Sequence, residues 1–283
     1  MLIKAGFNVE LELSEPSYIV TLLDLHASFE ASVIDRVPFT VRPSVPFETT
    51  RDTVGNVVRR FKAPAGLTIL SQTLTVSVPE IFEPHIGDAM DTPVGDVPLE
   101  CLPYLFGSRY CETDLLSSFA WSRFGGFPAG GPRVKAIFDF VHSHIRFDYN
   151  CASSTRTALG ALNEQVGVCR DFAHLAIALC RAVNVPARYV NGYLGDIRVP
   201  AVPYPMDFSA WCEVYVGGRW VTLDARHNVP RVGRIVIAKG RDAADVAMIT
   251  SFGPHRLSRF AVTAEEVFDE ALNRFRAPQR ASA

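Results

Sequence analysis

Three positions in the second half of the chain could together do cysteine chemistry on amides. Cys169 opens a very apolar segment that is predicted to be a helix. A helix N-terminus presents unpaired N–H groups and partial positive charge, which favour a thiolate and can hold a developing oxyanion. Such a nucleophile needs a base, and the base needs an orienting carboxylate. Asp224, near the end of "RWVTLDA" (219–225), could be that carboxylate.

A predicted hairpin brings Asp224 close to position 209. The pair "GG" at 217–218 joins "SAWCEVYV" (209–216) to the following strand as a tight turn. In a hairpin that closes there, residues that face each other have numbers that sum to about 435. Positions 209 and 224 come within two of that sum, so we expect them to lie close across the pair. The sequence has Ser209 at the place where a base is needed.

Four sequence blocks, taken in order, resemble the bacterial transglutaminase-like superfamily. They are "GVCRD" (167–171), "PARYVNGY" (186–193), "SAWCEVYV" (209–216) and "DARHN" (224–228). The resemblance covers roughly residues 130 to 260. It implies a papain-like core with Cys169 as the nucleophile and Asp224 as the orienting acid. It also implies acyl transfer through a thioester, on a peptide or protein amide substrate.

The chain departs from the family pattern at Ser209. The pattern has "HAW" where this chain has "SAW", and an unassisted hydroxyl hardly accepts a proton near neutral pH. General base catalysis is usually worth ~10²–10⁴-fold, so the sequence predicts an impaired enzyme. His227 is a candidate substitute base, although related sequences with an intact "HAW" tend to carry "DARHN" as well. Structural roles are expected for the other histidines of this region, which are His142, His144 and His174.

Several further residues are candidates for the walls of the cleft. Tyr149 and Asn150 could each supply an oxyanion donor, and Trp211 belongs either to the core or to the cleft wall, where its bulk would shield the site from water. Asp171 either caps the predicted helix or pairs with Arg188. The sequence leaves these alternatives open.

The elements that position these residues predict an α+β protein with two regions. Residues 1–105 read as an antiparallel β-sandwich or barrel followed by a linker (81–105), because β-branched runs alternate with Gly and Pro. Residues 106–270 read as the transglutaminase-like core, with a central helix packed on an antiparallel sheet. Residues 271–283 read as a disordered tail.

The helices are predicted from apolar residues at helical spacing. They are expected over 113–124, 132–147, 157–166 and 169–183. The last segment is apolar on nearly all sides, which is typical of a helix in the middle of a domain. Pro186 ends it.

Composition narrows the classes of partner. The 283 residues are 48% hydrophobic and carry a formal charge of -2, so no nucleic-acid partner is expected. No signal peptide or membrane span is visible, and the six cysteines form no CxxC pair and no zinc-finger spacing. We therefore expect a cytoplasmic protein with reduced thiols, without a metal, a cofactor or a membrane partner. The oligomeric state is left open.

Three functions remain open at this point. The first is an active enzyme that acts through a Cys169 thioester, as a protease, an amidase or a cross-linking acyltransferase. The second is an impaired or inactive relative whose cleft still binds a peptide-like segment. The third is a structural scaffold without a site.

Overall fold

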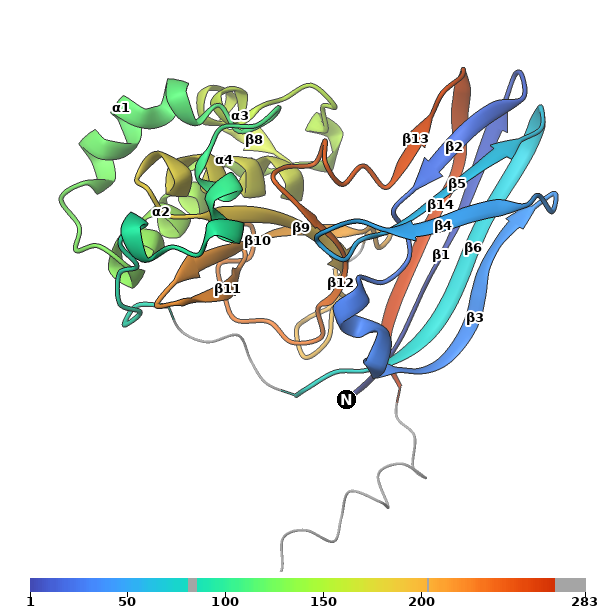
Figure 1. Ribbon diagram of the computed structural model, residues 1–283, viewed down its shortest axis with the longest axis horizontal. Coiled ribbons are helices and arrows are strands. Elements are labelled where there is room, and N and C mark those ends of the chain that lie inside the picture. Colours follow the sequence, from blue (N-terminus) through green and yellow to red (C-terminus); the bar gives the residue numbers. More distant parts are fainter. Residues whose placement is uncertain (81–85, 203, 268–283) are drawn as a thin grey trace, which may run out of the picture.

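The computed structural model describes residues 1–80, 86–202 and 204–267, and it confirms the α+β class. Figure 1 shows a β-sandwich beside a mixed region in which helices cover a sheet. The strands are β1 (Leu2–Leu13), β2 (Ser17–Thr21), β3 (Val33–Arg42), β4 (Phe47–Arg51), β5 (Val57–Ala63), β6 (Gly66–Ser77), β7 (Arg146–Phe147), β8 (Val166–Gly167), β9 (Ala187–Tyr193), β10 (Ser209–Val216), β11 (Arg219–Leu223), β12 (Ile235–Gly240), β13 (Ile249–Ser251) and β14 (His255–Val267). The α-helices are α1 (Thr113–Phe124), α2 (Gly131–His144), α3 (Ala158–Glu164) and α4 (Cys169–Ala182), and the 3-10 helices are η1 (Ala27–Ser32), η2 (Val94–Asp96), η3 (Leu99–Leu105) and η4 (Tyr149–Cys151).

The β-sandwich contains two antiparallel four-stranded sheets. Their strand orders are β14-β1-β6-β3 and β13-β2-β5-β4. Along β1, apolar residues such as Ile3, Val9 and Leu11 are buried and alternate with more exposed ones, as a strand with one buried face requires. A tight turn at residues 52–56 joins β4 to β5. There, Asp52 Oδ1 accepts hydrogen bonds from three successive backbone N–H groups.

The sandwich also includes strands from the end of the chain. β14 pairs with β1 over its whole length, and β13 pairs with β2. Both strands fall within residues 106–270, which were predicted to form the core. Their pairing means that the β-rich region is closed by residues far from it in sequence (Figure 1). The predicted tail, 271–283, lies outside the described residues.

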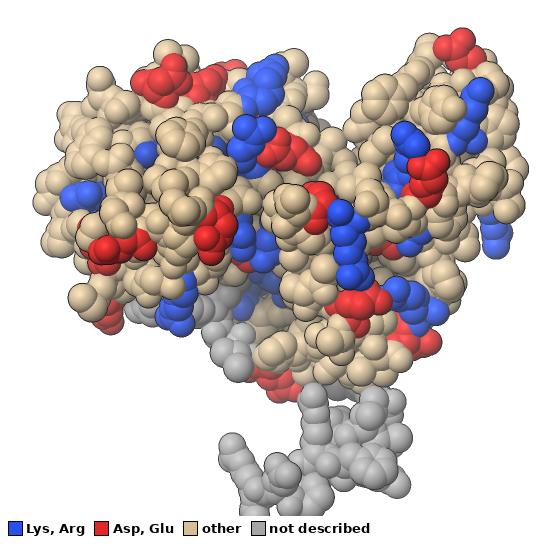
Figure 2. Space-filling view, viewed as in Figure 1, with Lys and Arg blue, Asp and Glu red and all other residues tan. Residues whose placement is uncertain are grey.

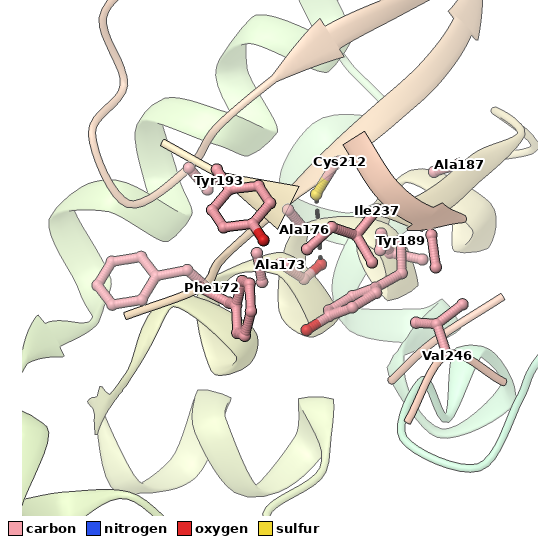
Figure 3. Packing of buried hydrophobic residues seen from close by; sticks show 14 of the residues in the cluster. Phe172, Ala173, Ala176, Ala187, Tyr189, Tyr193, Cys212, Ile237 and Val246 are labelled. Carbon is pink, nitrogen blue, oxygen red and sulfur yellow. Dashed lines mark hydrogen bonds between the residues drawn. The ribbon is translucent and has the colours of Figure 1, made fainter. Parts of the chain in front are cut away.

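The core sheet has the order β11-β10-β9-β12, and α4 packs against it. Helices α1, α2 and α3 surround α4 on its other sides (Figure 1). Figure 3 shows Cys212 of β10 directed at Ala173 of α4, and its Sγ donates to the Ala173 carbonyl at 3.5 Å. From Asp171 onward every residue of α4 is buried, which confirms the predicted central helix.

Polar residues inside this core have specific partners. The guanidinium of Arg181, which is 2% exposed, donates to the carbonyls of Ala187, Phe106 and Arg241. A buried cation is tolerated when its donors are satisfied in this way. Arg181 therefore ties three surrounding segments to the end of α4.

The surface and the helices bear on the classes of partner that the composition allows. On the face drawn in Figure 2, acidic and basic side chains are interspersed. Within the described residues, no helix is long and apolar enough to cross a membrane. All six cysteines are free thiols.

Candidate active site

Cys169 is the first residue of α4, as the sequence predicted. The carboxylate of Asp171 accepts a hydrogen bond from the backbone N–H of Val168 at 2.8 Å, so it caps the helix. Of the two roles open for Asp171, the structure shows this one, because Arg188 pairs with Glu213 instead, at 2.6 Å. Cys169 is thereby held at the tip of a rigid, buried helix.

The thiol of Cys169 is partly exposed, yet its surroundings are poorly solvated. Burial raises its pKa to about 11, although the guanidinium of Arg226 and the backbone N–H of Ala210 act in the opposite direction. At neutral pH roughly one thiol in 10⁴ is then a thiolate. The contact with Ala210 also locates the sulphur at the start of β10, next to Ser209.

The β10–β11 hairpin confirms the predicted register. Cys212 pairs with Leu223 and Val216 with Arg219, as expected for a turn at 217–218. Ser209 begins β10 and pairs with Gly192 of β9, and Asp224 directly follows β11. The hairpin therefore places both positions at one end of the core sheet.

All four acceptor positions of Asp224 are occupied. Its Oδ1 accepts from the backbone N–H groups of Arg226 (2.9 Å) and His227 (3.2 Å). Its Oδ2 accepts from His227 Nδ1 at 2.8 Å and from Arg234 at 2.9 Å. Burial raises the pKa of Asp224, but Arg234 and His227 outweigh it and hold this pKa well below its usual value. A carboxylate offers about four lone-pair sites, so this one is fully committed.

A cleft of about 720 Å³ lies beside these residues. Its lining includes Ser209, His227, Arg226 and Tyr149, together with the 194–202 loop and the end of β14. Cys169 is not among the lining residues. The thiol lies within electrostatic reach of Arg226 and Tyr149, two residues of the lining.

The structure brings some predicted wall residues to the cleft and leaves others outside it. Burial raises the pKa of the Tyr149 hydroxyl, which lines the cleft. The side chain of Asn150 is exposed, and its backbone N–H donates to Asp148 at 3.0 Å. Trp211 is 1% exposed and packs with Val190 and Val236 instead of lining the cleft.

His227 is the one histidine of the described chain that lines the cleft. Asp224 fixes its Nδ1, and its Nε2 makes no hydrogen bond within the described residues. His142 bonds to the carbonyls of Ala225 and Arg226, His144 bonds to Leu162, and His174 is completely buried against Tyr110. These three contacts agree with the structural roles expected for them.

Two arginines of the site were not singled out from the sequence. Arg234 binds Asp224 and stacks on Trp211, with its guanidinium carbon 4.8 Å from the ring centre. Arg226 stacks on Phe147 at 3.9 Å. Arg226 lies two residues after the predicted acid, and that proximity was the only sequence signal for it.

The arrangement can orient a base but holds no imidazole at position 209. It combines a helix-tip thiol, a preorganised carboxylate and a bordering cleft. The described residues hold no group of three or more His, Cys, Asp or Glu side chains that could bind a metal.

Comparison with known proteins agrees with this arrangement. A model of the transglutaminase-like superfamily matches residues 125–225. A protein of Cytophaga hutchinsonii, provisionally named a cysteine protease, has a crystal structure that is 31% identical in sequence. That match covers 95% of this chain and 92% of the other, with a TM-score of 0.84.

Two mycobacterial proteins match in part. An uncharacterized protein of Mycobacterium leprae is 36% identical over 121 residues, which make up 41% of this chain and 43% of that protein. An uncharacterized protein of Mycobacterium tuberculosis is 36% identical over 128 residues, which cover 41% of this chain and 40% of that protein. The chain therefore spans less than half the length of these curated relatives.

Proposed function

Because the chain belongs to the transglutaminase-like superfamily, we propose that it is a protein of the cysteine acyl-transfer or amide-hydrolysis class, impaired by the serine at position 209. In this proposal Cys169 is the nucleophile and Asp224 is the orienting acid. The cleft takes a peptide or protein amide. The name of the Cytophaga hutchinsonii protein agrees with protease-like chemistry.

The proposed reaction needs a proton acceptor near the thiol. The sulphur loses its proton and attacks the carbonyl carbon, the C–N bond breaks, and the amine leaves with a proton. Water or another amine then releases the acyl group from the thioester. An imidazole can take and return the proton in these steps, whereas the hydroxyl of Ser209 cannot do so near neutral pH.

One observation carries the proposal of impairment. The thiol of Cys169, with a pKa of about 11, is neutral at physiological pH, and the residue beside it at the start of β10 is a serine. The same observation favours a second function, in which the cleft binds a peptide-like segment without turnover. The volume of the cleft, about 720 Å³, is sufficient for several side chains.

The test compares the wild-type chain with its Ser209→His variant. Iodoacetamide labelling of Cys169 is followed by peptide mass spectrometry between pH 5 and 8, and amide hydrolysis is measured in parallel. We expect slow labelling of the wild type, faster labelling of the variant and new amidase activity in the variant, with Ser209→Ala as the matched control.

Two other outcomes would change the proposal. Equally fast labelling of both proteins would mean that another group activates the thiol, with His227 as the first residue to replace. Fast labelling of the variant without any amide turnover would support the binding function instead.

A further inference from the structure

Among the described residues that line the cleft, Arg226 is the arginine without a carboxylate partner within ion-pair distance. The other two arginines that line the cleft are paired: Arg198 with Glu80 and Glu266, and Arg231 with Asp196 at 3.9 Å. Within the part of the chain that the structure describes, the guanidinium of Arg226 makes no ion pair. Apart from an interaction with the hydroxyl of Tyr149, its N–H donors have no acidic partner among the described residues of the cleft.

The position of Arg226 is fixed from several sides. Its backbone N–H donates to Asp224, and its carbonyl oxygen accepts from His142 Nδ1 at 3.0 Å. Its guanidinium carbon lies 3.9 Å from the ring centre of Phe147 and 6.0 Å from that of Tyr149. Stacking of this kind orients the planar fork and limits the entropy lost when it binds a ligand.

The charges around Arg226 leave room for a carboxylate. Asp207, which also lines the cleft, interacts with Arg226 but lies beyond ion-pair distance, and it accepts the backbone N–H of Phe208 at 2.6 Å. Asp224 is saturated by its four donors. Neither carboxylate therefore forms an ion pair with the guanidinium of Arg226, which is left to bind a ligand.

We propose that Arg226 is the subsite for a substrate carboxylate next to the thiol, so that the cleft selects amides close to a free carboxylate or an acidic side chain. The inference rests on the proposed function for the role of Cys169. A guanidinium fork matches a carboxylate with two parallel N–H···O bonds, and the partly buried setting strengthens them. Arg226 is thus a specificity-determining residue.

Iodoacetate and iodoacetamide provide a direct test, because they differ only in a carboxylate and an amide. The rate of Cys169 labelling by each reagent is measured at pH 9 by peptide mass spectrometry, and the ratio of the two rates cancels any change in thiol pKa. We expect this ratio to fall at least about fivefold in Arg226→Gln, with Arg226→Lys in between. Arg198→Gln, a paired arginine of the same cleft, is the control.

Two results would overturn the inference. One is an unchanged ratio in Arg226→Gln, and the other is an equal fall in Arg198→Gln, which would indicate a diffuse field. In a second measurement, sodium acetate should slow iodoacetamide labelling of the wild type but not of Arg226→Gln, and melting curves should show that the variants fold. Labelling requires no turnover, so an inactive Ser209→His variant would count against the proposed function and leave this ratio readable.

Discussion

The two ends of the candidate site differ in how their polar groups are satisfied. At the acid end, Asp224 is 6% exposed, accepts four hydrogen bonds and holds a strongly lowered pKa. At the thiol end, burial raises the pKa of Cys169 to about 11. Ser209 lies beside this thiol at the start of β10. The carboxylate that would orient a base is therefore fully hydrogen-bonded, whereas the thiol that a base would activate lies beside a serine.

This contrast separates preorganisation from proton transfer. Arg234 and the backbone N–H groups of Arg226 and His227 keep the carboxylate of Asp224 ionised and fixed. The residue at position 209 takes no part in these contacts. The position of this carboxylate therefore does not depend on an imidazole at position 209. Replacing the thiol should therefore mainly change activity, whereas replacing the carboxylate should mainly change stability.

The largest effect is expected at the thiol. In the Ser209→His background, Cys169→Ala should reduce amide turnover by roughly 10³-fold or more, because the nucleophile acts with its base as a unit. Steady-state hydrolysis of a peptide amide measures this loss. Cys151→Ala, at a partly exposed thiol in η4, is the control, and an equal loss there would contradict the assignment.

Removing the charge at the acid end should cost stability. Asp224→Asn takes the carboxylate from the buried guanidinium of Arg234 and should lower the free energy of unfolding by about 3 kcal/mol. Urea denaturation at pH 7 measures the difference. Asp196→Asn, at a more exposed carboxylate of the cleft, should change it far less, and similar losses in both would contradict the contrast.

The same carboxylate predicts a pH dependence. Its pKa is lower in the folded protein than in the unfolded chain, so its contribution to stability is complete above the unfolded pKa of about 4. That contribution is lost as the pH falls further, toward the folded pKa. Thermal melts between pH 7 and 3 should therefore show the gap between the wild type and Asp224→Asn shrinking only below about pH 4. A gap that closes at pH 6 would point to another group.

The smallest effect concerns His227, which occupies an acceptor of Asp224. An imidazole at position 209 would compete with it for Oδ2. The double variant Ser209→His/His227→Ala should therefore hydrolyse amides faster than Ser209→His alone, by on the order of tenfold or less. A large loss in the double variant would instead identify His227 as the working base.

The sequence was most informative where local chemistry decides the geometry. Gly217 and Gly218 adopt φ values of 60° and 73°, as the two-residue turn needs, and this turn sets the register that brings Ser209 toward Asp224. The buried helix from Cys169 followed from its apolar residues on nearly all sides. These features depend on residues close together in the chain.

Features that depend on tertiary packing could not be predicted in this way. The pairing of β14 with β1 joins opposite ends of the described chain, and no local pattern encodes it. Arg226 and Arg234 have their roles only because Phe147, Trp211 and Asp224 meet them from other elements. The sequence left Trp211 open between the core and the cleft wall, and packing decides for the core, because its side chain is buried against β9 and β12.

The proposed impairment is decided by the pKa of the Cys169 thiol, measured from the pH dependence of its alkylation up to pH 11. We expect the wild-type thiol to titrate near 11, and we expect Ser209→His to shift its pKa well below 9 by forming an ion pair with the new imidazole. A wild-type thiol that already titrates near neutrality, with no change in the variant, would contradict the proposed impairment.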